Sequence, residues 1–126
     1  AYGITKVVGI ESRGFILGPA VAMDLGAGFV PVRKPGKLPA ETIEVSYAKE
    51  YGVDTIQIHA DALCENDVVL LHDDLLATGG SMAAALELVR KFNVKKVYIN
   101  FIVELEFLEG RKALGNDVEV SSLLSC

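Results

Sequence analysis

The sequence predicts an α/β fold in which a twisted parallel sheet is flanked by helices. Two observations lead to this fold class. Short, β-branched apolar runs, such as those at 6–10 and 68–71, alternate along the chain with longer segments whose apolar residues recur at helical spacing. A glycine follows or precedes several of these segments, as expected where the chain turns between a helix and a strand. Alternating strands and helices are typical of a Rossmann-like parallel sheet with right-handed crossovers.

Length and composition indicate one globular domain that spans residues 1–126. A hydrophobic fraction of 51% against 23% charged residues supplies enough apolar surface for a packed core. The formal net charge of −5 is opposite to the broad basic surface of a duplex nucleic-acid binder. No apolar run reaches the roughly 20 residues that cross a bilayer, and the start of the chain lacks a signal-peptide pattern. With only two cysteines, we expect a cytoplasmic protein that binds neither nucleic acid nor membrane.

The first third of the chain predicts a strand, a helix and a second strand. The strand at Lys6–Ile10 ends in a turn-like segment at Glu11–Gly14, and the apolar residues Phe15–Leu25 then fit a helix that stops at a glycine. Pro19 predicts that this helix starts late or bends. The next strand is expected at Gly28–Val32.

The segment that follows, about 33–58, predicts an arm that leaves the sheet. Its first part, Arg33–Gly52, is rich in proline, glycine and charge and has no helical period. Apolar and polar residues nevertheless alternate on both sides of Gly52, at Ile43, Val45, Tyr47, Ile56 and Ile58. Such alternation indicates a β-hairpin, and arms of this kind often cover a binding site.

The remaining elements return to the sheet. We expect a buried strand at Val68–Leu71, a helix at Ser81–Phe92 with one apolar face, and a strand at Val97–Val103. In such a sheet, ligands bind at the carboxyl ends of the strands.

The stretch VVLLHDDLLATGGS, from Val68 to Ser81, carries the clearest chemical signal. A buried strand delivers Asp73 and Asp74 to its carboxyl end, where their carboxylates suit ribose hydroxyls or water-bound Mg²⁺. The chain then enters a helix through a turn whose glycines let backbone N–H groups approach an anion and whose hydroxyls donate hydrogen bonds. The residues of this turn are Ala77, Thr78, Gly79, Gly80 and Ser81. Together the two features predict a sugar-phosphate site, although each alone also fits a polar strand exit or a capped turn.

An acidic protein can hold a further polyanion only with a local cluster of cations. Arg13, Arg33, Lys34 and Lys37 supply such a cluster, because arginine offers a bidentate fork and lysine a flexible point charge to phosphate oxygens. The alternative is a solvated charged loop. Beside a sugar-phosphate signal, we interpret these residues as a phosphate clamp.

The segment HDDLLATGGS resembles the phosphoribosyl pyrophosphate (PRPP) signature of the type I phosphoribosyltransferases. Two further stretches, GIESRGF at Gly9–Phe15 and VPVRKPGKLPAETIEVSYAKEYG at Val30–Gly52, are similar to the adenine-specific branch of that family. The resemblance covers essentially the whole chain. It implies a type I phosphoribosyltransferase fold in which the Glu11–Gly14 loop faces pyrophosphate, the hairpin arm is a flexible catalytic loop and Ala77–Ser81 holds the 5-phosphate.

The resemblance also implies an activity: adenine and PRPP give AMP and pyrophosphate in purine salvage, with Mg²⁺ required and a homodimer as the assembly. Glu50 and Tyr51 would then approach the ribose and the base, with Glu50 handling the proton that adenine loses, and Leu105 would pack against the base. A surface glutamate and a core leucine are the alternatives for these positions. His59 and His72 lie without a second ligand at metal spacing, and we expect both to be structural.

The chain departs from the family at its start, where members carry a further region that forms a hood over the base. In family members this region precedes the position that matches Ala1, and we expect this chain to lack the hood. Because base selectivity depends on the hood, a phosphoribosyltransferase for xanthine or hypoxanthine is a second interpretation. A PRPP-sensing regulatory domain without catalysis is a third.

Overall fold

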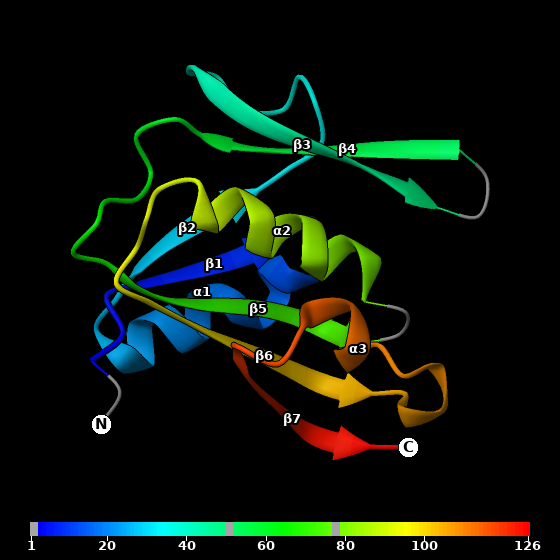
Figure 1. Ribbon diagram of the computed structural model, residues 1–126. Coiled ribbons are helices and arrows are strands. Elements are labelled where there is room, and N and C mark those ends of the chain that lie inside the picture. The colour runs from blue at the N-terminus through cyan, green and yellow to red at the C-terminus, as the bar shows by residue number, and fades with distance from the viewer. Residues whose placement is uncertain (1–2, 50–51, 77–78) are drawn as a thin grey trace.

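A twisted parallel sheet forms the centre of the molecule in the computed structural model, which describes residues 3–49, 52–76 and 79–126 (Figure 1). Its strands are β1 (Lys6–Ile10), β2 (Gly28–Val32), β5 (Val68–Leu76), β6 (Lys96–Glu104) and β7 (Glu119–Ser125). Within the described residues they are arranged in the order β2-β1-β5-β6-β7, and every pairing is parallel. The predicted α/β class is confirmed, and the carboxyl ends of all these strands lie at one edge.

Two helices cover opposite faces of this sheet. Helix α2 (Gly80–Arg90) packs on the face that carries the main core, where Leu71, Leu88 and Phe101 are buried to 1% exposure or less. Helix α1 (Gly14–Leu25) packs on the other face against a smaller apolar cluster around Val7. No helix in the described ranges is long and apolar enough to cross a membrane.

The predicted hairpin is confirmed as an antiparallel pair of strands, β3 (Thr42–Lys49) and β4 (Gly52–His59). The pair lies on the outer side of α2 in Figure 1. Its inward residues, including Ile56 and Ile58, join the main core, so the hairpin is packed onto the molecule. At its base, Arg33 and Gln57 exchange two backbone hydrogen bonds of 3.0 and 2.7 Å, which tie the chain after β2 to β4.

Two predicted boundaries were wrong. The helix predicted at Phe15–Leu25 is confirmed as α1, but the late start suggested by Pro19 was wrong. It begins at Gly14, because the amides of Phe15 and Ile16 already donate to the carbonyls of the preceding turn at 3.1 Å. Strand β5 does not end at Leu71 but continues to Leu76, because β6 runs beside it and supplies backbone partners along its length. The two aspartates therefore lie within the last part of the strand.

The C-terminal elements were not predicted from the sequence. After β6 come a 3₁₀ turn, η1 (Glu106–Leu108), a short helix, α3 (Arg111–Leu114), and the edge strand β7. The β7 residues Leu123 and Leu124 are 72% and 60% exposed, so this strand lacks the buried apolar pattern of the others. Leu114 is buried in the main core and anchors α3 beside α2.

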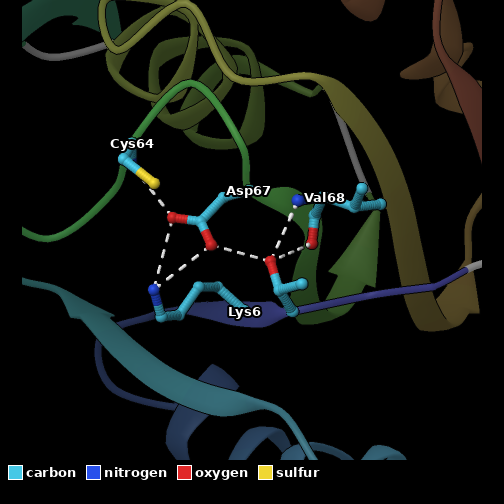
Figure 2. A network of polar contacts seen from close by, with 5 residues as sticks. Lys6, Cys64, Asp67 and Val68 are labelled. Carbon is cyan, nitrogen blue, oxygen red and sulfur yellow. Dashed lines mark hydrogen bonds and ion pairs between the residues drawn. The ribbon is translucent and has the colours of Figure 1, made fainter.

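A buried carboxylate joins the amino ends of β1 and β5 (Figure 2). Asp67 accepts hydrogen bonds from the hydroxyl of Thr5 at 2.7 Å, from the amide of Cys64 at 2.9 Å and from Nζ of Lys6 at 3.2 Å. The Thr5 hydroxyl in turn accepts a 3.0 Å bond from the amide of Val68. This network lies at the edge opposite the carboxyl ends of the strands and holds two neighbouring strands in register.

Candidate active site

A cavity of about 220 Å³ opens between the carboxyl ends of β1, β2 and β5 and the hairpin. The structure brings together at its wall five of the residues that the sequence singled out: Arg13, Arg33, Lys34, Asp73 and Ser81. They come from the loop after β1, the end of β2, the end of β5 and the first turn of α2. The fold thus gathers residues that are far apart in the sequence around one small volume.

The cations at this cavity are paired with carboxylates. Nε of Arg13 lies 3.3 Å from Oδ2 of Asp74, and Nε of Arg33 lies 3.2 Å from Oε1 of Glu11. Nζ of Lys34 lies 3.7 Å from a carboxylate oxygen of the hairpin residue Asp54. Three of the four cations of the predicted phosphate clamp are therefore paired with carboxylates, and their side chains are partly exposed.

Glu11 was predicted only as part of the Glu11–Gly14 loop, and its own contacts were not foreseen. Its carboxylate accepts a 2.9 Å hydrogen bond from the Lys34 amide and a 3.2 Å bond from Nε of Arg33. The hydrogen bond from the Lys34 amide lowers the pKa of Glu11. Burial acts against this, but the charge and hydrogen bond of Arg33 add to it, so the pKa stays below its usual value. Glu11 thus fixes the chain after β2 against the loop after β1. The sequence pointed to Glu11 through its place after a buried strand and through the resemblance of the stretch GIESRGF, but neither signal named Arg33 as its partner.

Asp54 and Tyr47 were not foreseen as site residues, although the hairpin register places them opposite each other. The Tyr47 hydroxyl lies 3.5 Å from Oδ2 of Asp54. Burial and the neighbouring Asp54 carboxylate raise the pKa of Tyr47, so the phenol stays protonated and remains a hydrogen-bond donor in the cavity wall. This pairing follows from the predicted turn: counting back from Lys49 opposite Gly52 places Tyr47 opposite Asp54.

The two aspartates of β5 differ in their surroundings. Asp73 accepts a 2.9 Å hydrogen bond from the Asp74 amide. Burial, reinforced by the negative charge of Asp74, raises the pKa of Asp73 to about 7. Asp74 is paired with Arg13 through Oδ2, while its Oδ1 is buried and has no hydrogen-bond partner among the residues described. Asp74 therefore has an acceptor oxygen without a partner, and it lies next to Asp73, whose carboxyl is hard to ionise. Both features are expected of a ligand site.

The turn into α2 is closely packed. Gly79 precedes the helix with φ 89°, and a Cβ at this position would lie 2.5 Å from the carbonyl oxygen of Gly110. Only glycine satisfies both the positive φ and this close approach. The first amides of α2 therefore begin at a rigid backbone corner next to Ser81, as expected of an anion site at a helix N-terminus.

The comparisons with known proteins agree with this geometry. The model of the phosphoribosyl transferase domain matches residues 1–120. An adenine phosphoribosyltransferase of Bacteroides thetaiotaomicron is 72% identical over 123 residues, which cover 98% of this chain and 70% of that relative. The chain belongs to the adenine phosphoribosyltransferase family.

Solved structures of the adenine phosphoribosyltransferase family share the whole arrangement. The crystal structure of the Rhodothermus marinus enzyme has a TM-score of 0.93 at 54% identity, covering 98% of this chain and 70% of that one. The Giardia lamblia enzyme, complexed with 9-deazaadenine, has a TM-score of 0.92 at 49% identity with the same coverage. The type I phosphoribosyltransferase fold expected from the sequence is therefore confirmed.

Other residues predicted from the family resemblance lie apart from the cavity or outside the described residues. Lys37 is exposed and does not line the cavity, although its charge contributes to the lowered pKa of Glu11. Leu105 follows β6, outside the cavity wall, and its amide donates a 2.9 Å hydrogen bond to the Leu76 carbonyl. Four further predicted residues lie outside the described ranges: Glu50, Tyr51, Ala77 and Thr78.

Among the described residues, His59 and His72 do not belong to any cluster of side chains that could bind a metal ion. His72 is 1% exposed, its Nδ1 lies 3.0 Å from Oδ1 of Asn100, and burial lowers its pKa so that the neutral ring is favoured. Nε2 of His59 is buried without a hydrogen-bond partner among the described residues. Within residues 3–49, 52–76 and 79–126, no three His, Cys, Asp or Glu side chains lie close enough together to hold a metal ion.

Proposed function

We propose that this chain transfers the phosphoribosyl group of PRPP to adenine, giving AMP and pyrophosphate. The observation that carries the proposal is the cavity itself, where Asp73, Ser81 at the start of α2 and the paired cations meet, with Asp74 next to it as the partner of Arg13. A sugar that bears a phosphate at one end and a pyrophosphate at the other needs all three: carboxylates for its hydroxyls, a helix N-terminus for the phosphate and cations for the pyrophosphate. The match to relatives named for adenine supports the choice of base.

The cations would hold the pyrophosphate of PRPP and stabilise it as it leaves. Arg13, Arg33 and Lys34 line the cavity and can exchange their carboxylate partners for phosphate oxygens. Lys37 would join them from the exposed loop between β2 and the hairpin. Because negative charge develops on the leaving group as the bond to the sugar breaks, cations that contact the pyrophosphate lower the barrier.

The aspartates would hold the ribose. Oδ1 of Asp74 is buried and unpaired among the described residues, so it can accept a hydrogen bond from a ribose hydroxyl or a water molecule. Mg²⁺ prefers oxygen ligands and retains several waters, so these two carboxylates fit it as partners of its bound water, with PRPP as the direct ligand. When bound, Mg²⁺ would neutralise charge on the pyrophosphate. The turn at Ala77–Ser81 would hold the 5-phosphate through backbone amides and hydroxyls.

The chemical step forms a bond between N9 of adenine and the anomeric carbon of the ribose, while the bond from that carbon to pyrophosphate breaks. Adenine loses its N9 proton, and Glu50 is the residue we assign to accept it. Tyr51 would contact the ribose beside it, and Leu105 would pack against the base. Glu50 and Tyr51 connect β3 to β4 in the sequence, so they would reach the ribose only when the hairpin arm closes over the cavity. The same closure would exclude water and prevent hydrolysis of PRPP.

A homodimer and a cytoplasmic location remain predictions. Apolar side chains on the outer surface of α1 support the dimer, since Ile16 is 72% and Met23 82% exposed. Sedimentation equilibrium would test it, with a single species of 13.5 kDa as the contrary result. The exposed free thiols of Cys64 and Cys126 are compatible with a reducing compartment.

The proposal is tested by pyrophosphate release from PRPP and Mg²⁺ with adenine, hypoxanthine, guanine and xanthine in turn. We expect release with adenine alone. Release with hypoxanthine or xanthine would instead assign another base. PRPP binding without any release would indicate a regulatory domain and contradict the enzyme assignment.

The role of Glu50 is tested with Glu50→Ala, using Glu87→Ala on the exposed side of α2 as the matched control. We expect kcat to fall by about 100-fold in Glu50→Ala, within the range of general acid–base catalysis, and to stay unchanged in the control. Unchanged turnover in Glu50→Ala would remove Glu50 from the mechanism while leaving the activity itself established.

A further inference from the structure

A buried carboxylate, paired with a half-exposed arginine, lies beside the end of the strand that leads into the α2 turn. Glu104, the last residue of β6, is 6% exposed, and both of its carboxylate oxygens accept bonds from Arg111 of α3, at 2.8 Å from Nε and 2.7 Å from Nη2. The Ser122 hydroxyl donates a third bond to the same carboxylate at 3.0 Å. Nη1 of Arg111 donates to the Val120 carbonyl at 3.0 Å. This bidentate geometry fixes the direction of α3 as well as its distance from the sheet.

Helix α3 is in direct contact with one end of the phosphate turn. The carbonyl of Gly110, just before α3, and the methyl of Ala113 within it lie so close to Gly79 that an added Cβ would meet them at 2.5 and 3.0 Å. Leu114 anchors the other end of α3 in the main core. The position of Gly79, and with it the start of α2, therefore depends on where α3 sits.

The other end of the phosphate turn is bound by the residue next to Glu104. The amide of Leu105 donates a 2.9 Å hydrogen bond to the carbonyl of Leu76, the last residue of β5 before the turn. Leu76, where β5 ends, is thus held beside Leu105, and Gly79, just before α2, is held beside α3. The Glu104–Arg111 ion pair connects these two supports.

We propose that the Glu104–Arg111 pair is a positioning clamp that sets Gly79 and the first turn of α2, which are the described part of the 5-phosphate site. The inference rests on the proposed function, because it takes that turn as the phosphate site. Neither residue lines the cavity, so the pair acts through Gly110 and Gly79 and makes no contact with substrate. A pair needed for stability alone would affect every ligand equally, whereas a clamp on this turn affects the phosphate end.

The experiment measures binding of two separate ligands by calorimetry, ribose 5-phosphate for the turn and inorganic pyrophosphate for the cation cluster. Arg111→Lys retains the charge but loses the planar fork, and Glu104→Gln retains the shape but loses the charge. The matched control is Arg90→Lys, which alters the exposed ion pair with Asp117 at the far end of α2.

We expect both clamp variants to raise the Kd of ribose 5-phosphate by about 10-fold, since small misplacements of a rigid site are costly. The Kd of pyrophosphate should stay within about twofold, and the control should match the wild type for both ligands. The clamp is overturned if folded Arg111→Lys binds ribose 5-phosphate as the wild type does. It is equally overturned if both ligands weaken together.

Two further results keep the clamp separate from other failures. If Arg111→Lys does not fold, the same comparison of the two ligands is made on Glu104→Gln, which keeps one oxygen acceptor for Arg111. If the wild type releases no pyrophosphate with any base yet loses ribose 5-phosphate affinity selectively in the clamp variants, the proposed reaction fails while the clamp is supported.

Discussion

Arg13, in the wall of the cavity, pairs with Asp74 of β5, with Nε of the arginine 3.3 Å from Oδ2 of the aspartate. The arginine side chain is 65% exposed, while the aspartate side chain is 26% exposed. The pair therefore joins a solvated cation, which can swing to a new partner, to a carboxylate that is fixed on β5. An anion that binds Arg13 must therefore compete with Asp74 for the guanidinium.

Arg13→Ala should weaken pyrophosphate binding by about 10-fold or more, the usual effect of losing hydrogen bonds to a charged group. Arg13→Lys should recover part of the loss, because it restores the charge without the fork. Calorimetric titration with pyrophosphate measures both. Arg90→Ala, which removes a cation from the surface far from the cavity, is the control. Equal affinities in Arg13→Ala and the control would remove Arg13 from the clamp.

Most of the fold could be predicted because its signals are local. Buried strands such as β1 show as apolar runs, and the hairpin shows as alternation on both sides of Gly52. The edge strand β7 could not be found, since its leucines face solvent and its alternation is weak. The end of β5 was misplaced for a similar reason: its last residues are held by pairing with β6, and a polar Asp-Asp sequence resembles the end of a strand.

The candidate site was predicted where one short segment carries several signals, as in the stretch with Asp73 and the glycines of the turn. It was missed where a residue matters through a distant partner. Glu11 acts through Arg33, and Asp54 through Lys34, pairs that form only when the loop after β1, the end of β2 and the hairpin meet. Charge alone gives no indication of which loop glutamate or aspartate will find such a partner.

Gly79→Ala should disable the turn into α2. The change imposes a positive φ on alanine and drives its Cβ to within 2.5 Å of the Gly110 carbonyl oxygen, so the start of α2 must move. We expect a loss of about 3 kcal/mol in the free energy of unfolding and of about 100-fold in ribose 5-phosphate affinity. Urea denaturation and calorimetry measure the two effects.

The control for that change is Gly26→Ala, at the end of α1. Gly26 has φ 67° but nothing within 4 Å of an added Cβ, so it carries the backbone strain without the contact. It should lose about 1 kcal/mol and bind ribose 5-phosphate normally. If Gly79→Ala were no worse than Gly26→Ala, the close packing between the turn and α3 would have no role.

Asp73→Asn should stabilise the ligand-free protein at neutral and higher pH while reducing turnover. The pKa of Asp73 is raised to about 7 in the folded state by burial and by Asp74, against about 4 when unfolded. Between these values the folded state binds more protons than the unfolded state, so the stability of the wild type falls as the pH rises from 4 to 7. Asparagine carries no such charge and can still accept the hydrogen bond from the Asp74 amide.

Thermal unfolding without ligands checks this expectation. The Tm of Asp73→Asn should exceed that of the wild type by roughly 5 °C at pH 8 and by less at pH 5. A difference that is constant with pH would mean that Asp73 ionises normally. A fall in stability at pH 8 would show that the ionised carboxylate is favoured in the folded protein.

Asp67→Asn should act in the opposite direction, at the far edge of the sheet (Figure 2). Burial disfavours ionisation of Asp67, but hydrogen bonds from Thr5, the Cys64 amide and Lys6 outweigh it and lower the pKa of the carboxyl. A lowered folded-state pKa gives stability that is complete above the unfolded value, near 4, and is lost as the pH falls through the folded value. The wild type should therefore exceed Asp67→Asn by about 2 kcal/mol at pH 7.

Urea denaturation at a series of pH values tests this. The gap between wild type and Asp67→Asn should be constant from pH 7 to about 5 and should shrink as the pH drops below about 4. Asp24→Asn, at an exposed position on α1, should show almost no gap at any of these values. If the gap persisted undiminished in acid, the network would act through shape and neutral hydrogen bonds, and the carboxylate charge would not be what joins β1 to β5.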